Sequence, residues 1–487
     1  MNEQHTHTDL APDLRITRVV TGLWQIADME RDERSVDLDE AARSMTAYTD
    51  AGLATFDMAD HYGSAEDIAG IFATKYAGDT DVRMLTKWVP KPGGSSRETV
   101  RQAVQRSLDR LQTDCLDLLQ YHAWNYADPS YLDDLFHLQA LKEEGLIRHL
   151  GLTNFDTDHL AIVLASGIEV VSNQVCFSLL DQRASADMAK LCEDRRVKLL
   201  AFGTLAGGFL TERWLGKPEP AMDELATWSQ MKYKRFIDAA GGWARLQGVL
   251  AALSEVSRKH GVSMSVISSR YMLDQPAVGG IILGARLGHG DHVKENLAIF
   301  STTLDQEDRE CIAQAVNRLD PIPGGCGDEY RKPPFLTASG DLSDHLESMP
   351  AVFTAVDDDC GKSRVFSGTV WEDFAGYCRA VRSGKRILVS GTTAAHGKRL
   401  IGGGDPAAQT HFVIDKIQAA IESLGGKLED VDRTRIFVSD VINCEAVARA
   451  HGERFGQIQP VNTLVEAKLV GPDYLVEIEA EARTKEV

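Results

Sequence analysis

Short apolar runs alternate with longer segments of helical periodicity over the first two-thirds of the chain. Eight of these runs have the length and composition of buried strands: RVVTGLWQ, TFDMA, RMLTKW, CLDLLQYHA, IRHLGLTN, VVSNQV, KLLAFGT and GGIILGA. Eight strand–helix units in about 300 residues match a (β/α)8 TIM barrel, whose usual size is about 250 residues. A doubly wound sheet is the alternative, but no G-x-G-x-x-G motif follows the first strand. The pattern therefore predicts an α/β fold built on a TIM barrel.

The length and charge of the chain narrow the remaining possibilities. At 487 residues it is too long for one ordinary core, so two or three domains are expected. The composition, 43% hydrophobic and 25% charged, is typical of a soluble globular protein, and no run approaches the roughly 20 apolar residues of a membrane helix. A net charge of −20 argues against a nucleic-acid partner. The N-terminal MNEQHTHTDLAPD does not resemble a signal peptide, and eight scattered cysteines lack zinc spacing, so we expect a cytoplasmic protein without a metal site.

Four polar side chains end or follow three consecutive predicted strands. Asp57 ends the second strand and Tyr62 lies in the loop after it, whereas Lys87 ends the third strand and His122 the fourth. The active site of a TIM barrel lies at the C-terminal ends of its strands, so adjacent loops would bring these four side chains together. A strand-terminal Lys or His alone is more often structural, but a set of four in consecutive loops is typical of a catalytic site.

This set of side chains suits carbonyl reduction. Tyrosine has an unperturbed pKa of about 10, and a nearby cation favours its phenolate, so Lys87 can make Tyr62 a usable general acid. Asp57 would hold Lys87 charged and in place. A neutral His122 could donate to the substrate oxygen and fix its orientation. Because no side chain supplies hydride, we expect a bound nicotinamide cofactor and a small carbonyl or alcohol substrate.

Residues from about 14 to 320 resemble an aldo-keto reductase, whose catalytic tetrad falls on the four residues just described. GLTNF at 151–155 resembles the family's carboxamide-binding loop, and AFGTLAGGFLT at 201–211 resembles the segment whose aromatic, here Phe202, stacks on the nicotinamide. ILGARLGHGDHVKEN at 282–296 resembles the loop at the adenosine end. The cofactor-binding positions that the resemblance implies are Gly22, Leu23, Trp24, Thr153, Asn154, Gln174, Phe202, Gly203, Thr204, Leu205, Gly284, Ala285, Arg286, His292, Glu295 and Asn296.

The loop at the adenosine end departs from the family's pattern. It is two residues longer than usual between Gly284 and Asn296, and His292 stands where Arg or Gln is usual. A 2′-phosphate needs a fixed cation, which Arg286 could supply. We therefore expect NADP as the cofactor, with NAD as the alternative.

Three tryptophans and one insertion surround the predicted site. Trp24, Trp88 and Trp124 stand beside tetrad or cofactor positions and could wall the substrate pocket, although packing at the barrel rim is an equal alternative. A long insertion, residues 206–241, follows the seventh strand. Long loops on this face of a barrel are usually substrate lids.

The composition changes after Leu319. DPIPGGCGDEYRKPPFLTASGDL is rich in Pro, Gly and polar residues and has no periodicity, so it predicts a linker or a tail folded over the barrel. Cys326, between glycines, is the cysteine that we expect to be exposed.

From about residue 367 an α+β pattern begins. Strand-like RILVSGTT precedes a long amphipathic helix at 406–424, and RTRIFVSDV, a further helix, TLVEAKL and YLVEIEAEA follow. The segment resembles the RidA (YjgF-like) family, through AGYCRAVRSG, LVSG and VEIEAEA. The resemblance implies a chorismate-mutase-like α+β fold, a trimer, and hydrolysis of reactive enamines and imines.

The RidA-like pocket is expected at Tyr377, Ser390, Asn462 and Glu477. In active members of the family a short segment that begins with Pro carries an arginine, which binds the substrate carboxylate. Here that segment is QPVNTLVE, so Asn462 takes the place of the arginine. Because Asn has no charge and lacks the bidentate fork of Arg, we do not expect deamination of amino-acid-derived enamines.

The predicted organisation is a reductase barrel over 1–320, a linker or tail over 321–359 and a RidA-like domain over 360–487. We expect an NAD(P)H-dependent oxidoreductase that reduces an aldehyde or ketone, or oxidises the matching alcohol, with a second domain that assembles it as a trimer. One alternative is a two-site enzyme whose RidA-like pocket handles a reactive imine, enamine or carbonyl compound. The other is a cofactor-sensing subunit in which catalysis is incidental.

Overall fold

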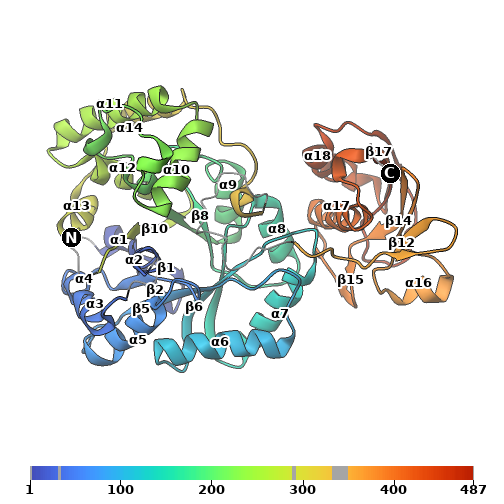
Figure 1. The fold of residues 1–487 in the computed structure, drawn as a ribbon, viewed down its shortest axis with the longest axis horizontal. Coiled ribbons are helices and arrows are strands. Elements are labelled where there is room, and N and C mark those ends of the chain that lie inside the picture. The colour runs from blue at the N-terminus through green and yellow to red at the C-terminus, as the bar shows by residue number, and fades with distance from the viewer. Residues whose placement is uncertain (1–2, 31–34, 288–291, 332–348, 486–487) are drawn as a thin grey trace.

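The chain forms a larger body, coloured blue to yellow in Figure 1, and a smaller one, coloured orange to red. The computed structural model describes residues 3–30, 35–287, 292–331 and 349–485. Residues 288–291 of the predicted adenosine-end loop and 332–348 of the predicted linker therefore lie outside the described residues.

The larger body is a closed barrel of eight parallel strands, in the order β10-β3-β4-β5-β6-β7-β8-β9. Closure of the sheet confirms the TIM barrel and excludes the doubly wound alternative. The strands are β3 (Val19–Gly22), β4 (Thr55–Asp57), β5 (Arg83–Trp88), β6 (Leu116–His122), β7 (Ile147–Thr153), β8 (Ser172–Cys176), β9 (Lys198–Phe202) and β10 (Val278–Gly284). A hairpin of β1 (His7–Ala11) and β2 (Leu14–Thr17) precedes them, and its Leu14 and Ile16 pack with inward residues of the barrel strands.

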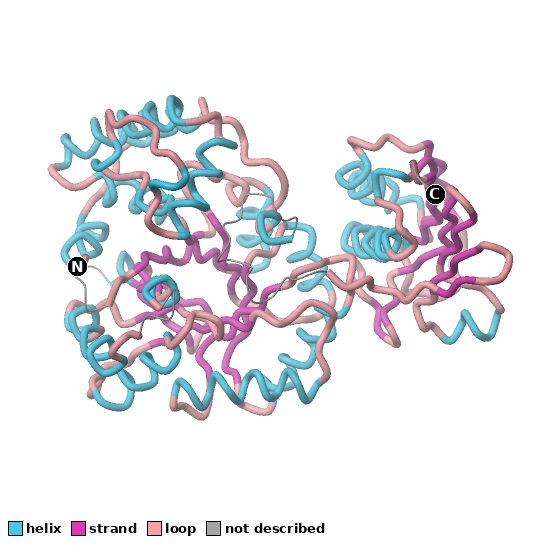
Figure 2. The backbone as a smooth tube through the Cα atoms, in the orientation of Figure 1, coloured by secondary structure: helices cyan, strands magenta, loops and turns pink. Residues whose placement is uncertain are grey.

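Helices surround the barrel, as Figure 2 shows in cyan around magenta strands. They are α3 (Leu38–Ser44), α4 (Thr46–Asp50), α5 (Ala65–Lys75), α6 (Arg97–Leu111), α7 (Ser130–Glu143), α8 (Thr157–Ala165), α9 (Asp187–Arg195), α11 (Trp243–His260), α12 (Met264–Leu273), α13 (Val293–Ser301) and α14 (Gln306–Val316). Local sequence explains their ends. The Ser96 hydroxyl accepts from the backbone N–H of Thr99 at the start of α6, and Asp156 accepts from the N–H of His159 at the start of α8.

The insertion after β9 folds over the mouth of the barrel. It contains the short turns η2 (Ala206–Gly208), η3 (Glu212–Trp214) and η4 (Met222–Glu224) and then α10 (Trp228–Ala239). Lys232 and Tyr233 of α10 are buried and face the barrel mouth together with Gly207 and Gly208. The insertion therefore forms one wall of the cavity described below.

The segment after α14 packs against the barrel as far as α15 (Asp328–Arg331). Arg183 holds it, because one guanidinium nitrogen donates to the Gly325 carbonyl at 2.6 Å and pairs with Glu329 at 3.0 Å. The prediction of an exposed Cys326 is wrong, since its side chain is only 3% exposed. Glycines around a cysteine indicate an irregular backbone, but they do not indicate whether that backbone lies on another part of the protein.

The smaller body is a seven-stranded sheet in the order β11-β12-β13-β14-β19-β17-β18, with helices on one face. All of its neighbouring strands are antiparallel except β17 and β18. The strands are β11 (Val356–Asp357), β12 (Lys362–Val365), β13 (Ala380–Ser383), β14 (Arg386–Thr393), β17 (Val431–Val438), β18 (Val461–Glu466) and β19 (Val476–Arg483). The helices are α16 (Val370–Ala375), α17 (Pro406–Glu422) and α18 (Cys444–Phe455), and a small hairpin joins β15 (Ala395–His396) to β16 (Arg399–Leu400).

Helix α17 is buried on nearly all sides, which the amphipathic pattern of its sequence does not indicate. Phe412 and Ile417 belong to the apolar core, whereas His411 and Asp415 are buried polar residues. The reason is that α17 contacts the sheet of its own domain and also α8 of the barrel. The polar face of the helix is therefore an interface between the two domains.

Among the described residues, no helix has both the length and the apolar character needed to cross a membrane.

Candidate active site

A cavity of about 690 Å³ lies at the C-terminal ends of the barrel strands. This volume is within the range of roughly 300–1,000 Å³ that is usual for small-molecule sites. Its lining includes all four members of the predicted tetrad, Asp57, Tyr62, Lys87 and His122. The barrel brings them together because β4, β5 and β6 are neighbours in the sheet and end at the same face.

Asp57 and Lys87 form a buried ion pair across β4 and β5. The Lys87 ammonium donates to Asp57 Oδ2 at 2.5 Å and to the Met58 carbonyl at 2.8 Å. The other carboxylate oxygen accepts hydrogen bonds from Gln120 at 3.1 Å and Gln174 at 2.8 Å. Burial lowers the pKa of Lys87 from its usual value, and the charge of Asp57 opposes that shift. The carboxylate thus fixes the ammonium in one position.

Tyr62 lies beside this ion pair. The Lys87 nitrogen is 4.9 Å from the centre of the Tyr62 ring, and Trp24 packs edge-on to that ring at 4.9 Å between centroids. A cation at this range favours the phenolate over the phenol.

His122 lies at the end of β6, the strand next to the one that carries Lys87. Its Nδ1 is 3.4 Å from the Thr153 carbonyl, and its ring is edge-on to those of Trp124, at 4.4 Å, and Tyr330, at 5.7 Å. A contact of 3.4 Å is weak, so it does not commit the proton to Nδ1. The tautomer with its proton on Nε2, which can donate to a substrate oxygen, loses only that weak contact.

Most of the expected cofactor positions also line the cavity. These are Gly22, Trp24, Thr153, Asn154, Gln174, Phe202, Gly203, Thr204, Leu205, Gly284, Arg286 and His292. Leu23 and Ala285 are buried and do not line it, and Glu295 and Asn296 belong to α13 outside the lining.

The lining fits a nicotinamide cofactor. Over the described part of the chain, the buried Asn154 Oδ1 and Thr204 Oγ1 have no hydrogen-bond partner, so both can accept from a bound amide or hydroxyl group. Two glycines of the lining are required by the packing around them: a Cβ on Gly22 would lie 2.7 Å from Ile282 Cγ2, and one on Gly203 would collide with the Tyr233 hydroxyl. The half-buried Phe202 supplies an aromatic surface in the same cavity.

The edge of the cavity carries the groups expected at the adenosine end. Arg286 is exposed, and its Nε donates to Gln25 Oε1 at 3.4 Å. His292 is exposed too, with Nδ1 3.3 Å from Glu295 Oε2. Arg286 is thus an exposed cation at the rim of the lining.

The three tryptophans differ in position. Trp24 and Trp124 line the cavity, and the Trp124 indole donates to the Pro90 carbonyl at 2.6 Å. Trp88 is buried against Tyr121, at 5.7 Å between ring centroids, and does not line the cavity.

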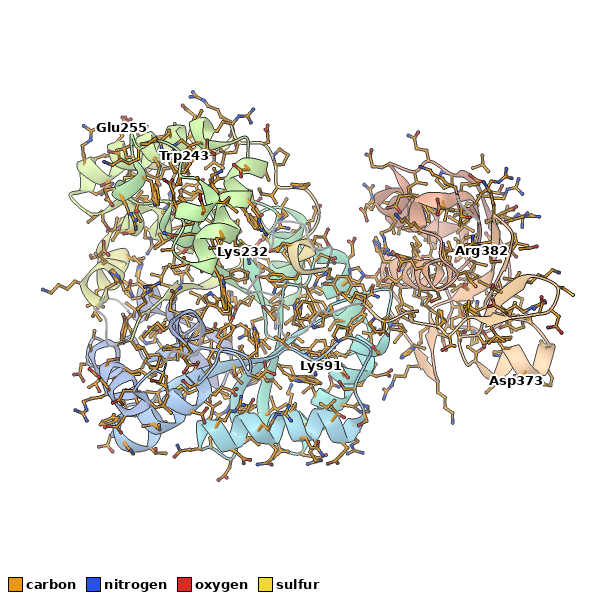
Figure 3. The ribbon with its side chains drawn as sticks, in the orientation of Figure 1. Lys91, Lys232, Trp243, Glu255, Asp373 and Arg382 are labelled. Atoms are coloured by element: carbon orange, nitrogen blue, oxygen red, sulfur yellow. The ribbon has the colours of Figure 1, made fainter. Side chains whose placement is uncertain are left out.

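Several lining residues were not identified from the sequence. Lys232, labelled in Figure 3, comes from the insertion, and its ammonium donates to the Tyr330 hydroxyl and lies 5.2 Å from the centre of the Phe202 ring. Tyr330 comes from a segment without periodicity. Neither position carries a motif that could have revealed it. Gln120, which does not line the cavity but donates to Asp57, does have a signal, because it lies two residues before His122 and so points to the same side of β6.

Three of the four expected RidA-like pocket residues lie around Arg379 and Gly391: Arg379 donates to the Tyr377 hydroxyl at 3.5 Å, and Ser390 and Glu477 adjoin Gly391. Ser390 lines a hollow of about 410 Å³ on the open face of the sheet, and its hydroxyl donates to the Cys378 carbonyl at 2.8 Å. Tyr377, Asn462 and Glu477 do not line that hollow. The Asn462 amide nitrogen lies 3.4 Å from His451 Nε2, on the side of the sheet that faces α18.

The sequence matches two family models. The model of the aldo/keto reductase family matches residues 18–317, which is more than half of the chain, so the protein belongs to the aldo/keto reductase family and is an oxidoreductase of a class that uses nicotinamide cofactors. The model described as endoribonuclease L-PSP matches residues 371–484, so the C-terminal domain is a RidA/YjgF domain.

Known relatives match the two domains separately. The uncharacterized oxidoreductase YqkF of Bacillus subtilis is 30% identical over 314 residues, which are 62% of this chain and 92% of that protein. The uncharacterized protein SCO2049 of Streptomyces coelicolor is 41% identical over 120 residues, 24% of this chain and 90% of that protein. The solved structure of glycerol dehydrogenase AKR11B4 from Gluconobacter oxydans is 22% identical, covers 66% of this chain and 98% of its own, and has a TM-score of 0.55, which supports the barrel fold.

Proposed function

We propose that the barrel is an NADP(H)-dependent oxidoreductase that reduces an aldehyde or ketone, or oxidises the matching alcohol, with Tyr62 as the general acid in the direction of reduction. The observation that carries the proposal is the buried Lys87–Asp57 pair beside the Tyr62 ring, in one cavity with His122. Such an arrangement prepares a phenol to release a proton.

The residues act in the following way. The cofactor, when bound, supplies the hydride. Tyr62 donates its hydroxyl proton to the carbonyl oxygen of the substrate, and the Lys87 ammonium stabilises the phenolate that remains. Asp57 keeps the ammonium charged and in place, and the amides of Gln120 and Gln174 hold the carboxylate. His122 orients the carbonyl oxygen by a hydrogen bond from Nε2.

We further propose NADP rather than NAD, because Arg286 is an exposed cation at the edge of the cavity and an arginine suits a 2′-phosphate. Asn154 is proposed to bind the carboxamide group and Phe202 to stack on the nicotinamide ring. The free oxygen of Asn154 and the position of Phe202 in the cavity lining support these assignments.

For the C-terminal domain we propose assembly rather than deamination. The sheet face opposite the helices carries the exposed apolar side chains of Leu388, Val461 and Val465. Such a face is suited to burial between copies of the chain, and a closed cyclic trimer buries it on every copy. Asn462 lies against His451 and offers no charge for a carboxylate. Light scattering on the full chain should give a trimer or a multiple of three, and a monomer would reject the assembly role.

The catalytic proposal is tested by following the absorbance of reduced cofactor with a panel of aldehydes, ketoses and pyridoxal. We expect carbonyl-dependent loss of NADPH absorbance for at least one class of substrate. A matched assay with an enamine derived from an amino acid should give no deamination. Deamination without reductase activity would reverse the roles proposed for the two domains.

A further inference from the structure

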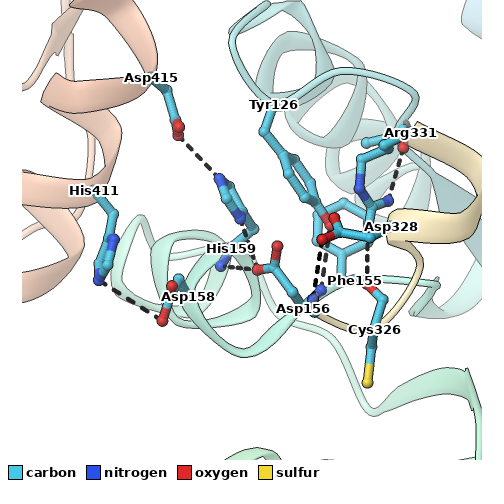
Figure 4. A network of polar contacts seen from close by, with 12 residues as sticks. Tyr126, Phe155, Asp156, Asp158, His159, Cys326, Asp328, Arg331, His411 and Asp415 are labelled. Carbon is cyan, nitrogen blue, oxygen red and sulfur yellow. Dashed lines mark hydrogen bonds and ion pairs between the residues drawn. The ribbon is translucent and has the colours of Figure 1, made fainter. Parts of the chain in front are cut away.

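The contact between the two domains contains a buried histidine held by two carboxylates (Figure 4). His159 lies on α8 of the barrel, and its Nδ1 is 2.6 Å from Asp156 Oδ1. Its Nε2 is 3.0 Å from Oδ2 of Asp415, which lies on α17 of the C-terminal domain. The second oxygen of Asp415 accepts from Arg454 of α18 at 2.7 Å. The C-terminal domain therefore supplies one of the two anions that surround this imidazole.

Both ring nitrogens of His159 face carboxylate oxygens, so the ring is an imidazolium that donates in both directions. Burial alone would lower the pKa of His159, but the charges of Asp156 and Asp415 and their hydrogen bonds raise it to about 9. A buried imidazolium that lost Asp415 would keep only one of its two acceptors. The position of the ring, and of Asp156 with it, therefore depends on the other domain.

Tyr126 connects this histidine with the mouth of the barrel. Its ring stacks on the His159 ring at 3.5 Å between centroids and 5° between planes. Its hydroxyl accepts from the backbone N–H of Asp156 at 3.3 Å and lies 3.5 Å from the Asn154 carbonyl. The guanidinium of Arg331 lies 4.1 Å from the centre of the same ring. A shift of the His159 ring would thus move Tyr126 and the backbone at 154–156.

Arg331 completes the chain of contacts from His159 to the cavity residue Asn154. It donates to the carbonyl of Asn154, to that of Ala123 at 3.0 Å and to that of Cys326 at 2.7 Å. Asn154 itself has a φ of 62°, in the left-handed region, which is uncommon for residues other than glycine although asparagine adopts it more readily than most. Its backbone is held there by Arg331 and by a hydrogen bond from its N–H to the Gln174 carbonyl at 2.8 Å. These contacts stabilise the left-handed conformation over the other backbone conformations open to an asparagine.

We propose that Asp415 and His159 are positioning residues for the nicotinamide cofactor. Through them the C-terminal domain holds Asn154 in the left-handed conformation that directs its side chain into the cavity. This inference rests on the proposed function, in which Asn154 binds the carboxamide. The second domain would then contribute to cofactor binding whether or not its own pocket binds a ligand.

The test measures cofactor binding by the full chain with Asp415→Ala and with the isosteric Asp415→Asn. Titration with NADPH should show a Kd raised about five- to twentyfold by Asp415→Ala, at the lower end of the coupling usual between distant sites. The kcat at saturating NADPH should stay within about twofold of the unaltered chain, because Tyr62 and Lys87 are not moved. Amide hydrogen exchange at residues 153–156 should become faster, and Asp415→Glu should restore part of the affinity.

A second ion pair between the domains provides the matched control. His396 of the β15–β16 hairpin lies 2.7 Å from Asp133 of α7, and this pair has no contact with Tyr126 or Asn154 among those that the described residues make. His396→Gln should leave the Kd for NADPH and the exchange at 153–156 unchanged. The melting temperature of each variant, measured in parallel, shows whether it folds.

Three results would overturn the inference. A folded Asp415→Ala and Asp415→Asn that both bind NADPH as the unaltered chain does would remove the positioning role. An equal loss of affinity in His396→Gln would show that docking in general, and not this path, is responsible. If the unaltered chain bound neither NADPH nor NADH, the proposed function would be rejected and the inference with it.

Discussion

The two domains place the same kinds of side chain in very different surroundings. In the barrel, an acid, a phenol, an ammonium and an imidazole from neighbouring strand ends converge on one cavity of about 690 Å³. In the C-terminal domain, Tyr377, Ser390 and Glu477 lie around Arg379 and Gly391, whereas Asn462 lies apart beside His451; of these four, only Ser390 lines the hollow on the open face of the sheet. A complete polar set indicates chemistry within one chain. A set with Asn462 in the place of the expected arginine supports the proposal that this domain serves assembly.

The buried cations of the two domains, Lys87 and Arg379, also differ in their surroundings. Lys87 in the barrel is paired with Asp57 beside a cavity, where a change of charge can act on a ligand. Arg379 in the C-terminal domain is equally buried, but it donates to the Gly391 carbonyl at 2.8 Å and the Thr392 hydroxyl at 3.0 Å. Its donors are engaged in holding the sheet together. A buried cation is therefore a sign of function only where it faces open space.

The substitution Tyr62→Phe gives the largest expected effect and tests whether the polar set in the barrel is catalytic. This change removes the proton donor and leaves the ring, so we expect the affinity for cofactor to persist and kcat to fall by about 10²–10⁴-fold. Steady-state rates, together with a cofactor titration of the same variant, measure both quantities. If more than about a tenth of the unaltered kcat remains while chemistry limits the rate, Tyr62 is not the general acid.

Lys87→Met should remove most of the activity as well, by about 10²-fold or more, because the phenolate then forms without its neighbouring cation. The buried Asp57 carboxylate is left unpaired, so a thermal melt must accompany the assay. The pH–rate profile of any residual activity should shift from that of the unaltered enzyme. An unchanged rate with an unchanged profile would contradict the role of the ion pair.

The substitution Arg286→Ala tests whether Arg286 binds the 2′-phosphate of NADPH. NADPH binding should weaken by roughly 10- to 100-fold, which corresponds to about 1.5–3 kcal/mol for a charge-assisted contact, whereas NADH binding should change little. Fluorescence titrations with the two cofactors give the ratio. Equal losses for both would mean that another group, with His292 as the next candidate, holds the 2′-phosphate.

The smallest expected effect is the pH dependence of the stability that the His159–Asp415 contact between the domains provides. The pKa of His159 is raised in the folded chain from 6.5 to about 9, so its stabilisation is complete below pH 6.5 and is lost as the pH rises through about 9. The pKa of Asp415 is instead lowered from 3.8, because Arg454 and His159 outweigh its burial, and that contribution is lost in acid. Asp156 and Asp158 also interact with the charge of the ring. The pKa of Asp156 is lowered, as that of Asp415 is, so its contribution to stability is likewise lost in acid.

The difference in melting temperature between the unaltered chain and Asp415→Asn should therefore be largest near pH 6 and should shrink by about pH 10. Melts across this range measure it. A difference that stayed constant from pH 6 to pH 10 would show that His159 is not charged in the interface.

The sequence was informative where periodicity and strand ends determine position. The eight strands and the convergence of Asp57, Lys87 and His122 follow from the closed barrel, because every parallel strand ends at the same face. Lys232 and Tyr330 could not be predicted, since an insertion and an aperiodic tail carry no signal of where they fold. Trp88 stands next to Lys87 and consequently points to the other side of β5, into the packing against Tyr121.

The domain interface could not be predicted from the sequence for a related reason. The amphipathic pattern of α17 predicts one buried face, and a polar face of that kind usually contacts water. Here Asp415 and His411 are buried because α8 covers them, and His411 Nε2 lies 3.7 Å from Asp158 of that helix. Sequence patterns report the burial of a helix within its own domain and do not report its contact with another.

In the proposed reaction, the barrel transfers a hydride from a nicotinamide cofactor to a carbonyl carbon while Tyr62 protonates the oxygen. The most direct measurement uses reduced cofactor that carries deuterium at C4, with the best substrate from the carbonyl panel, and locates the label in the product by mass spectrometry. The account predicts one deuterium on the former carbonyl carbon, and none on that carbon when unlabelled cofactor is used in deuterated water. Label that arrives on the carbon from the solvent, and not from the cofactor, would contradict it.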